Sequence, residues 1–113
     1  MSIKRIDPGA RMSQAVVHGS MAYLAGQVAL GDGVAAQTQA VLDQIDALLT
    51  QAGTDKSKIL TATIYLADIS TFGEMNAVWD NWVSAGNPPA RATVEAKLAT
   101  PDYKVEIVVT AVI

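Results

Sequence analysis

Arg91 has the side chain and the position best suited to chemistry in this sequence. It begins a β-branched stretch after Asn87-Pro88-Pro89-Ala90, and strand alternation places it on one face with Thr93 and Glu95. A guanidinium held on a rigid strand binds a carboxylate through paired hydrogen bonds. An arginine at a strand end also forms ordinary surface ion pairs, here with Glu95 or Glu106. The residue pattern leaves both interpretations open.

Glu106 is a second candidate because it interrupts an apolar stretch, between Val105 and Ile107. A carboxylate in this position orients or deprotonates a water molecule in some enzymes. It also serves elsewhere as a plain partner for a cation, which here would be Arg91 or Lys104. The pattern does not decide between these two roles.

The remaining polar and aromatic residues are weaker candidates. His18, the single histidine, falls at a predicted hairpin tip, where we expect it to be exposed. Asn76 lies among helix-core residues, and asparagines in helices are usually solvated. Trp79 and Trp82 are three residues apart and are typical of core packing. The segment 31–33 (Gly-Asp-Gly) lacks the lysine and the further glycines of a phosphate-binding loop.

The composition excludes several kinds of catalysis. The chain has no cysteine and one histidine, so it has no thiolate nucleophile and no Cys-ligated or His-rich metal site. A Ser-His-Asp triad would depend entirely on His18, and no nucleophile elbow is present. We therefore expect no metal and no cofactor. Catalysis would depend on positioning, hydrogen bonds and water.

Hydrophobic periodicity predicts the elements that hold these residues. Apolar residues at helical spacing predict a helix over 34–52, with Gly53 as its left-handed cap. Thr71 and Glu74 have the spacing of a capping box at the start of a second helix, which Asn87-Pro88-Pro89 would end. Strands are expected over 15–18, 21–30, 59–67, 91–98 and 103–113. This order predicts one α+β domain over residues 1–113, with both helices on one face of a mixed sheet.

The last predicted strand indicates what covers the other face of the sheet. Val105, Ile107 and Val109 point one way, as expected beneath the helices, but Val108 and Val112 on the opposite face are also apolar. Only 17% of the residues are charged, against about 25% in an average globular protein. Both features favour an oligomer in which subunits cover the second face.

Charge and hydropathy also limit the partners. The net charge is −3 and the eight basic residues are scattered, which argues against binding of nucleic acid. The N-terminus has no apolar signal core, and the chain has no run of about 18 apolar residues. We therefore expect a cytoplasmic protein that does not bind a membrane.

Four segments resemble the RidA/YjgF (Rid) family. The two strongest are Pro88 to Ala96 (PPARATVEA) and Lys104 to Ile107 (KVEI). Leu24 to Gln27 (LAGQ) is similar to the family's SGQ segment, and residues 68–79 are similar to its D-x-x-x-F-x-x-M-N-x-x-W helix. The whole chain looks closest to the YoaB-like branch.

This resemblance implies a chorismate-mutase-like fold in a homotrimer, with clefts between subunits. It also implies hydrolysis of reactive 2-imino or enamino acids to 2-keto acids and ammonia. In that case Arg91 holds the substrate carboxylate, Glu106 acts on water, and Gly26 and Asn76 line the pocket. Three substrate-binding positions depart from the pattern of RidA proteins, which carry tyrosine, serine and cysteine where this chain has Met12, Ala25 and Thr93. A shifted substrate range or a reduced activity is therefore expected.

Two other classes of function remain open. The same cleft could bind a small carboxylate metabolite without catalysis. The protein could also be a chaperone-like interaction protein or an RNA-cleaving factor, although its acidic charge argues against RNA.

Overall fold

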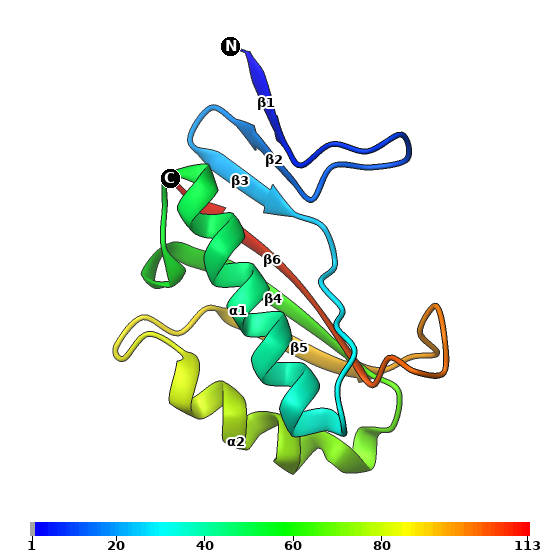
Figure 1. The fold of residues 1–113 in the computed structure, drawn as a ribbon. Helices are drawn as coiled ribbons and strands as arrows, with labels where there is room; N and C mark the ends of the chain where they lie inside the picture. Colours follow the sequence, from blue (N-terminus) through cyan, green and yellow to red (C-terminus); the bar gives the residue numbers. More distant parts are fainter. Residues whose placement is uncertain (1) are drawn as a thin grey trace.

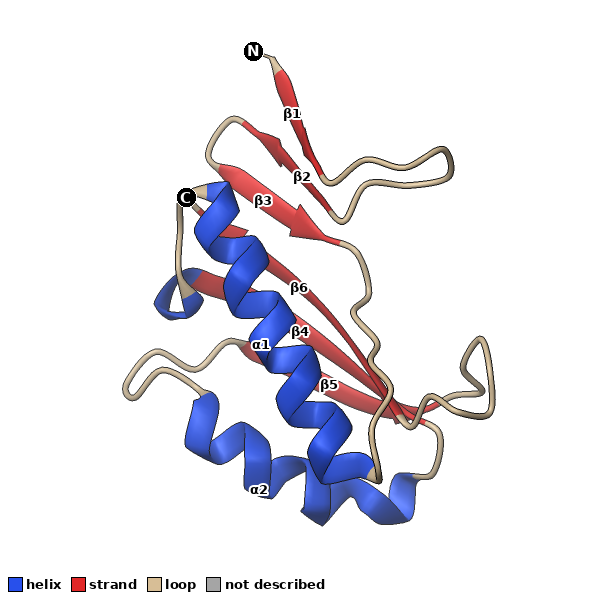
Figure 2. Ribbon diagram, viewed as in Figure 1, coloured by secondary structure: helices blue, strands red, loops and turns tan. Residues whose placement is uncertain are grey.

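The computed structural model describes residues 2–113, which form a mixed six-stranded sheet with α1 and α2 packed on one face (Figures 1 and 2). The strand order is β1-β2-β3-β6-β4-β5, and only β4 and β5 are parallel. The predicted fold class is confirmed. The elements are β1 Ile3–Ile6, β2 Ala15–His18, β3 Met21–Leu24, α1 Val34–Ala52, β4 Ile59–Leu66, α2 Phe72–Trp82, β5 Ala90–Glu95 and β6 Val105–Val112, with short 3-10 helices at Lys56–Lys58 and Ile69–Thr71.

Helix α1 has the predicted bounds and the predicted cap. It ends at Ala52, and Gly53 then adopts the left-handed conformation (φ 86°), which glycine reaches without a steric penalty. One stripe of α1, including Val41, Ile45 and Leu49, is fully buried against the sheet. The periodicity of the apolar residues thus determined both the extent of this helix and the face that it buries.

Helix α2 begins differently from the prediction. The Thr71 hydroxyl donates to the carbonyl oxygen of Asp68 (2.6 Å), so the predicted capping box with Glu74 does not form. The reason is the 3-10 turn before α2: its cap is Asp68, whose carboxylate accepts from the backbone N–H of Ser70 (2.9 Å). Thr71 already lies inside a helical turn, and its side chain faces backwards. The helix also ends at Trp82, five residues before the expected stop at Asn87.

The sheet has one covered and one open face, as the last strand predicted. In β6, Val105, Ile107 and Val109 are buried beneath the helices. The alternating residues of β6, which include Val108 and Val112, are only half-buried because no element of residues 2–113 covers them. This open face is the surface that the apolar pattern assigned to subunit packing.

Several predicted strand bounds were wrong at their ends. The strand expected over 21–30 ends at Leu24, because the N–H of Ala25 turns to the carbonyl oxygen of Gln14 (2.8 Å). Gln27 rejoins the sheet only through a single bridge to Ile107. The strand expected over 91–98 ends at Glu95, and β1 was not expected at all. These bounds depend on pairing partners rather than on local residue pattern.

Candidate active site

The guanidinium of Arg91 is held by α2. Its Nη1 donates to Oδ1 of Asn76 at 2.7 Å, and its central carbon lies 5.2 Å from the ring centroid of Trp79 and 5.8 Å from that of Phe72. The three helix residues are spaced i, i+4 and i+7, which places them on one face of α2. The spacing of these three residues therefore lets α2 contact the half-buried Arg91 at three points and fix its orientation.

This arrangement rules out one open alternative and corrects one expectation. Among residues 2–113 no carboxylate lies within 4.0 Å of Arg91, so the surface ion pair with Glu95 or Glu106 does not form. Glu95 instead accepts a hydrogen bond from the backbone N–H of Ile69 (3.1 Å). Asn76 is half-buried and bound to Arg91, and is not the solvated helical asparagine that its position suggested.

Thr93 lies on the same face of β5 as Arg91. Arg91 is paired with Ala62 and Thr93 with Ile64, and both of these β4 residues are buried beneath the helices. The Thr93 hydroxyl is buried and has no hydrogen-bond partner among residues 2–113. A buried hydroxyl without a partner costs free energy, so this atom is an available hydrogen-bonding group beside the Arg91 cation.

Glu106 lies on the open face, opposite Tyr65 in the sheet. It lines a hollow of about 310 Å³ together with Lys97 and Leu98. Gly26 runs directly against it: a Cβ at position 26 would lie 2.9 Å from Cδ of Glu106. Glycine is therefore required at position 26 for as long as Glu106 keeps this conformation.

Arg91 and Glu106 are not brought together within one chain. They lie two strands apart on opposite faces of the sheet, about 10 Å across the strands and about 10 Å along them. The predicted residues thus form two groups. Arg91, Asn76 and Thr93 lie beside α2, whereas Gly26 and Glu106 lie near the open face.

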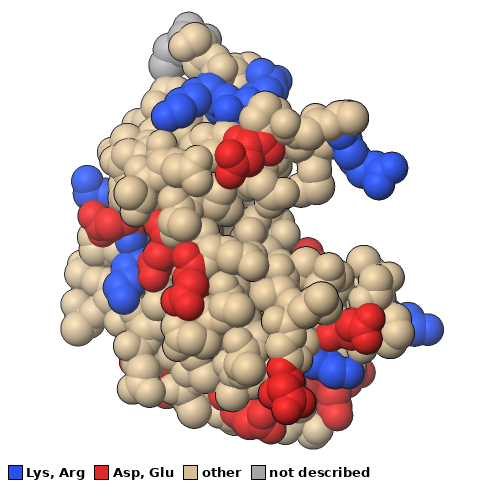
Figure 3. Space-filling view, viewed as in Figure 1, with Lys and Arg blue, Asp and Glu red and all other residues tan. Residues whose placement is uncertain are grey.

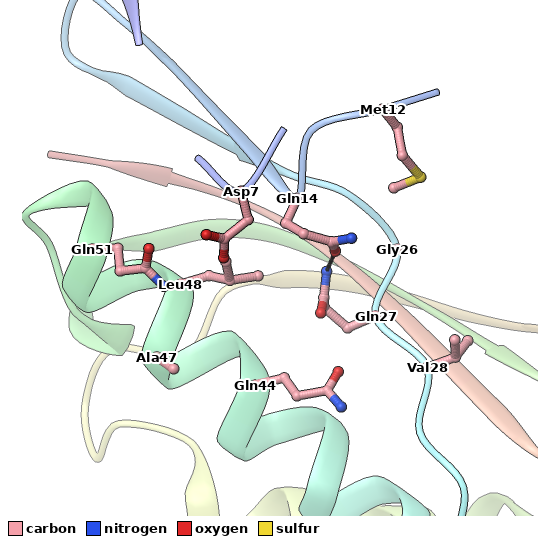
Figure 4. A pocket seen from close by; sticks show the side chains of 10 residues that line it. All are labelled: Asp7, Met12, Gln14, Gly26, Gln27, Val28, Gln44, Ala47, Leu48 and Gln51. Atoms are coloured by element: carbon pink, nitrogen blue, oxygen red, sulfur yellow. Dashed lines mark hydrogen bonds between the residues drawn. The ribbon is translucent and has the colours of Figure 1, made fainter. Parts of the chain in front are cut away.

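Met12 and Ala25 are the two remaining predicted residues. Met12 lies in the connection between β1 and β2, and Ala25 directly follows β3. Met12 is 47% exposed in the loop before β2 and, with Gly26, lines a hollow beside α1 (Figure 4). Ala25 is half-buried and precedes Gly26. Sequence reasoning missed the rings of Phe72 and Trp79 as the support of the arginine. Their regular spacing with Asn76 was the available signal.

Comparisons with known proteins find similar sequences and structures over nearly the whole chain. A sequence model described as Endoribonuclease L-PSP matches residues 2–113. A RutC family protein of Haemophilus influenzae is 50% identical over 114 residues, with 98% of each chain covered, and the RutC family protein YoaB of Escherichia coli is 48% identical over the full length of both. The crystal structure of a YjgF-family protein from Neisseria meningitidis superposes with a TM-score of 0.97 at 48% identity, covering 99% of this chain and 95% of that one.

The chain belongs to the YjgF/RidA family. The resemblance carried by Pro88 to Ala96 and by Lys104 to Ile107 is thereby confirmed. The solved YjgF-family structure from Neisseria meningitidis also supports the arrangement of two helices on a mixed six-stranded sheet.

Two negative findings bear on which groups the protein can bind. In residues 2–113 no helix is long and apolar enough to span a membrane, and no three His, Cys, Asp or Glu side chains gather in a way that could hold a metal ion. On the face drawn in Figure 3, basic and acidic side chains are scattered in small groups and form no basic stripe of the kind that binds nucleic acid.

Proposed function

We propose that this protein hydrolyses small 2-imino or enamino acids to 2-keto acids and ammonia, in a site that two neighbouring subunits of a homotrimer build together. One subunit supplies Arg91, Asn76 and Thr93, and the next supplies Glu106 and Gly26, with Ala25 and Met12 at the edge of the same half. The observation that carries this proposal is the Arg91 guanidinium, which is oriented by Asn76 and has no carboxylate partner among residues 2–113.

The unpaired guanidinium suits an anionic small molecule. A carboxylate binds such a group through two charge-assisted hydrogen bonds, and the two rings beside Arg91 reduce competition from water. Asn76 occupies one donor and leaves the others for a substrate. A 2-imino acid presents its carboxylate next to the reactive carbon, so holding the carboxylate also positions that carbon.

Glu106 supplies the second part of the reaction. As a general base it takes a proton from water while the water oxygen bonds to C2 of the imine, and the C=N electron pair moves to nitrogen. Proton transfer to nitrogen then allows the C–N bond to break, so that ammonia leaves and the C2 oxygen becomes the keto oxygen. The overall change is imino acid plus water to keto acid plus ammonia, with no cofactor. An enamino acid enters after tautomerising to the imine.

The assembly is supported by the sheet geometry. Because Arg91 and Glu106 point to opposite faces, they meet only when a second copy brings its own open face towards β5 and α2. That open face has apolar side chains to bury, including Val94 (44% exposed) and Tyr23 (48% exposed). Burying such a face is favourable because it removes apolar area from water.

The decisive experiment measures loss of the imine. The purified protein is added to an amino-acid oxidase reaction, and the transient imine is trapped with semicarbazide. We expect the wild type to lower the trapped fraction, and R91A to abolish the effect while circular dichroism stays unchanged. Binding of the keto acid without faster loss of the imine would instead indicate a carboxylate-binding protein. Wild-type rates for R91A would refute the assignment.

A mixing experiment tests the shared site. R91A and E106Q chains are each inactive by this proposal, but co-refolding them in equal amounts pairs an intact Arg91 with an intact Glu106 in about one quarter of the sites of a cyclic oligomer. We expect about that fraction of wild-type activity to return. If both residues acted within one chain, mixing would restore nothing.

A further inference from the structure

A hollow of about 540 Å³ lies between α1 and the N-terminal strands, at the opposite end of the strand order from β5 (Figure 4). Its volume is within the range of small-molecule sites. Apart from Gly26 and Met12 at its edge, its lining has no part in the proposed reaction. The lining residues are Asp7, Met12, Gln14, Gly26, Gln27, Val28, Gln44, Ala47, Leu48 and Gln51.

The polar groups of this hollow are arranged around a buried amide. Gln27 is 6% exposed, and its Nε2 donates to Oε1 of Gln14 (3.1 Å) and to the carbonyl oxygen of Ala25 (3.0 Å). Both of its donor hydrogens are therefore used, whereas its own Oε1 accepts no hydrogen bond from residues 2–113. In Figure 4 this oxygen faces the side of the hollow where Gln44 projects from α1. A fixed acceptor inside a pocket requires a donor on whatever fills it.

Asp7 adds a negative charge to the same space. Its carboxylate points towards α1 above Leu48 (Figure 4), and no basic group of residues 2–113 lies within 4.0 Å of it. Lys4 lies next to the hollow: its ammonium donates to the carbonyl oxygen of the lining residue Gln51 (3.1 Å), but Lys4 is not itself part of the lining. Asp7 also has a positive φ (48°), which is unusual for a residue other than glycine and is unfavourable before Pro8.

Apolar side chains form another part of the lining, beside the amides of Gln44 and Gln51. Leu48 and Ala47 on α1, with Val28 and Met12 across from them, provide hydrocarbon surface next to the polar groups. We propose that this hollow is a binding site for a small organic cation, an ammonium or guanidinium group on a short hydrocarbon stem. The cationic head donates to Asp7 and to Oε1 of Gln27, and the stem packs on the apolar side chains.

The chemistry of the lining argues against two other classes of ligand, anions and purely apolar molecules. An anion would meet the Asp7 carboxylate with no lining cation to offset it. A purely apolar ligand would leave Oε1 of Gln27 without a partner after displacing water. Both arguments depend on Asp7 and Gln27, which have no role in the proposed deaminase reaction, whereas Met12 and Gly26 border both sites.

The test uses two probes of nearly the same shape. n-Butylguanidinium and neutral n-butylurea are titrated into the wild-type oligomer by calorimetry, with amide chemical shifts followed by NMR. We expect the cation to bind at least about tenfold more tightly than the urea, a difference of about 1.4 kcal/mol. The shift changes should centre on Gln27, Gln44 and Leu48. Equal affinity for the two probes, or shift changes elsewhere, would overturn the proposal.

Variants separate this site from nonspecific binding. D7N removes the charge and keeps a residue that tolerates positive φ, so we expect it to abolish the preference for the cation. A47F places a ring in the hollow from an exposed helix position and should abolish binding. A35F makes the same change at another exposed position of α1, outside the lining, and should bind as the wild type does. Binding that survives both D7N and A47F would contradict the assignment.

Discussion

Nη1 of Arg91 donates a 2.7 Å hydrogen bond to Oδ1 of Asn76 on α2. This bond joins an edge strand to a helix and orients a guanidinium that no carboxylate of residues 2–113 neutralises. The orientation is provided by a neutral amide, which leaves the positive charge for a ligand. A carboxylate at position 76 would have held Arg91 in the same place but would have neutralised its positive charge.

The first prediction follows from this difference. N76D should place a carboxylate against Arg91 and compete with the substrate, raising KM at least about tenfold. N76A removes only the orienting bond and should raise KM by a smaller factor. Steady-state kinetics of both variants with an oxidase-generated imine checks the order. An N76D enzyme with unchanged KM would show that Arg91 does not bind the substrate carboxylate.

The close approach of Gly26 to Glu106 gives the second prediction. G26A places a methyl group 2.9 Å from Cδ of Glu106, so the carboxylate must move and kcat should fall by roughly tenfold or more. The thermal midpoint should change little, because a flexible side chain yields rather than the backbone. G73A is the matched control, since a Cβ there meets nothing within 4 Å. It should keep full activity and gain about 0.5–1 kcal/mol of stability. An unchanged kcat for G26A would show that Glu106 has no part in the reaction.

The open face gives the third prediction. V108E introduces a charge on the half-buried side of β6, opposite Thr63. We expect it to dissociate the proposed oligomer to monomers in sedimentation experiments and to abolish the proposed deamination, because each proposed site needs two subunits. A35E, an exposed change on α1, should leave both properties intact. A monomeric V108E protein with full activity would contradict the shared site.

The fourth prediction concerns acid stability. The Ser70 hydroxyl and the Ser70 backbone N–H bond to the Asp68 carboxylate and hold its pKa below the ordinary value of 3.8, and Ser57 lowers the pKa of Asp55 in the same way. Because the folded-state pKa is lowered, the stabilisation is present above pH 3.8 and is lost as the pH falls through the folded-state value. The thermal midpoint of D55N/D68N should therefore depend less on pH than that of the wild type below pH 3.8. Identical pH profiles would show that the two turns do not contribute.

The sequence predicted the fold well where local pattern determines structure. The apolar spacing in residues 34–52 and Gly53 were sufficient to define α1, because a helix is built from interactions within its own segment. The capping box at Thr71 failed because the preceding 3-10 turn changed the direction of its side chain. β1 was missed because its residues Ile3–Ile6 do not alternate between apolar and polar, and the strand forms through its pairing with β2.

The candidate site could be predicted residue by residue but not as an arrangement. Arg91 and Glu106 were singled out by residue type and position, family resemblance gave roles to them and to Asn76, and strand alternation placed Arg91 with Thr93. That Arg91 and Glu106 point to opposite faces depends on the order β6-β4-β5 and on the register of both pairings. Non-local pairing of this kind has no signal in a single sequence.

Thr93 supports a final prediction, because its buried hydroxyl has no partner among residues 2–113. T93V replaces the hydroxyl with a methyl group of similar size and should raise the free energy of unfolding by about 1 kcal/mol. The same change removes a hydrogen-bonding group beside Arg91, so we expect kcat/KM for the imine to fall about fivefold, or about 1 kcal/mol in transition-state binding. T93S keeps the hydroxyl and should retain most of the activity.

Opposite effects on stability and activity are what distinguish a functional hydroxyl from a structural one. If the hydroxyl served the fold, its replacement in T93V would lower the stability of the protein, because its hydrogen-bond partner would be left unpaired. A hydroxyl that is kept for a ligand lowers the stability of the empty protein, and this cost is recovered only when the ligand binds. Denaturant unfolding and kinetics on the same T93V preparation measure both quantities. A destabilised T93V protein with normal kcat/KM would assign Thr93 to the fold and not to the site.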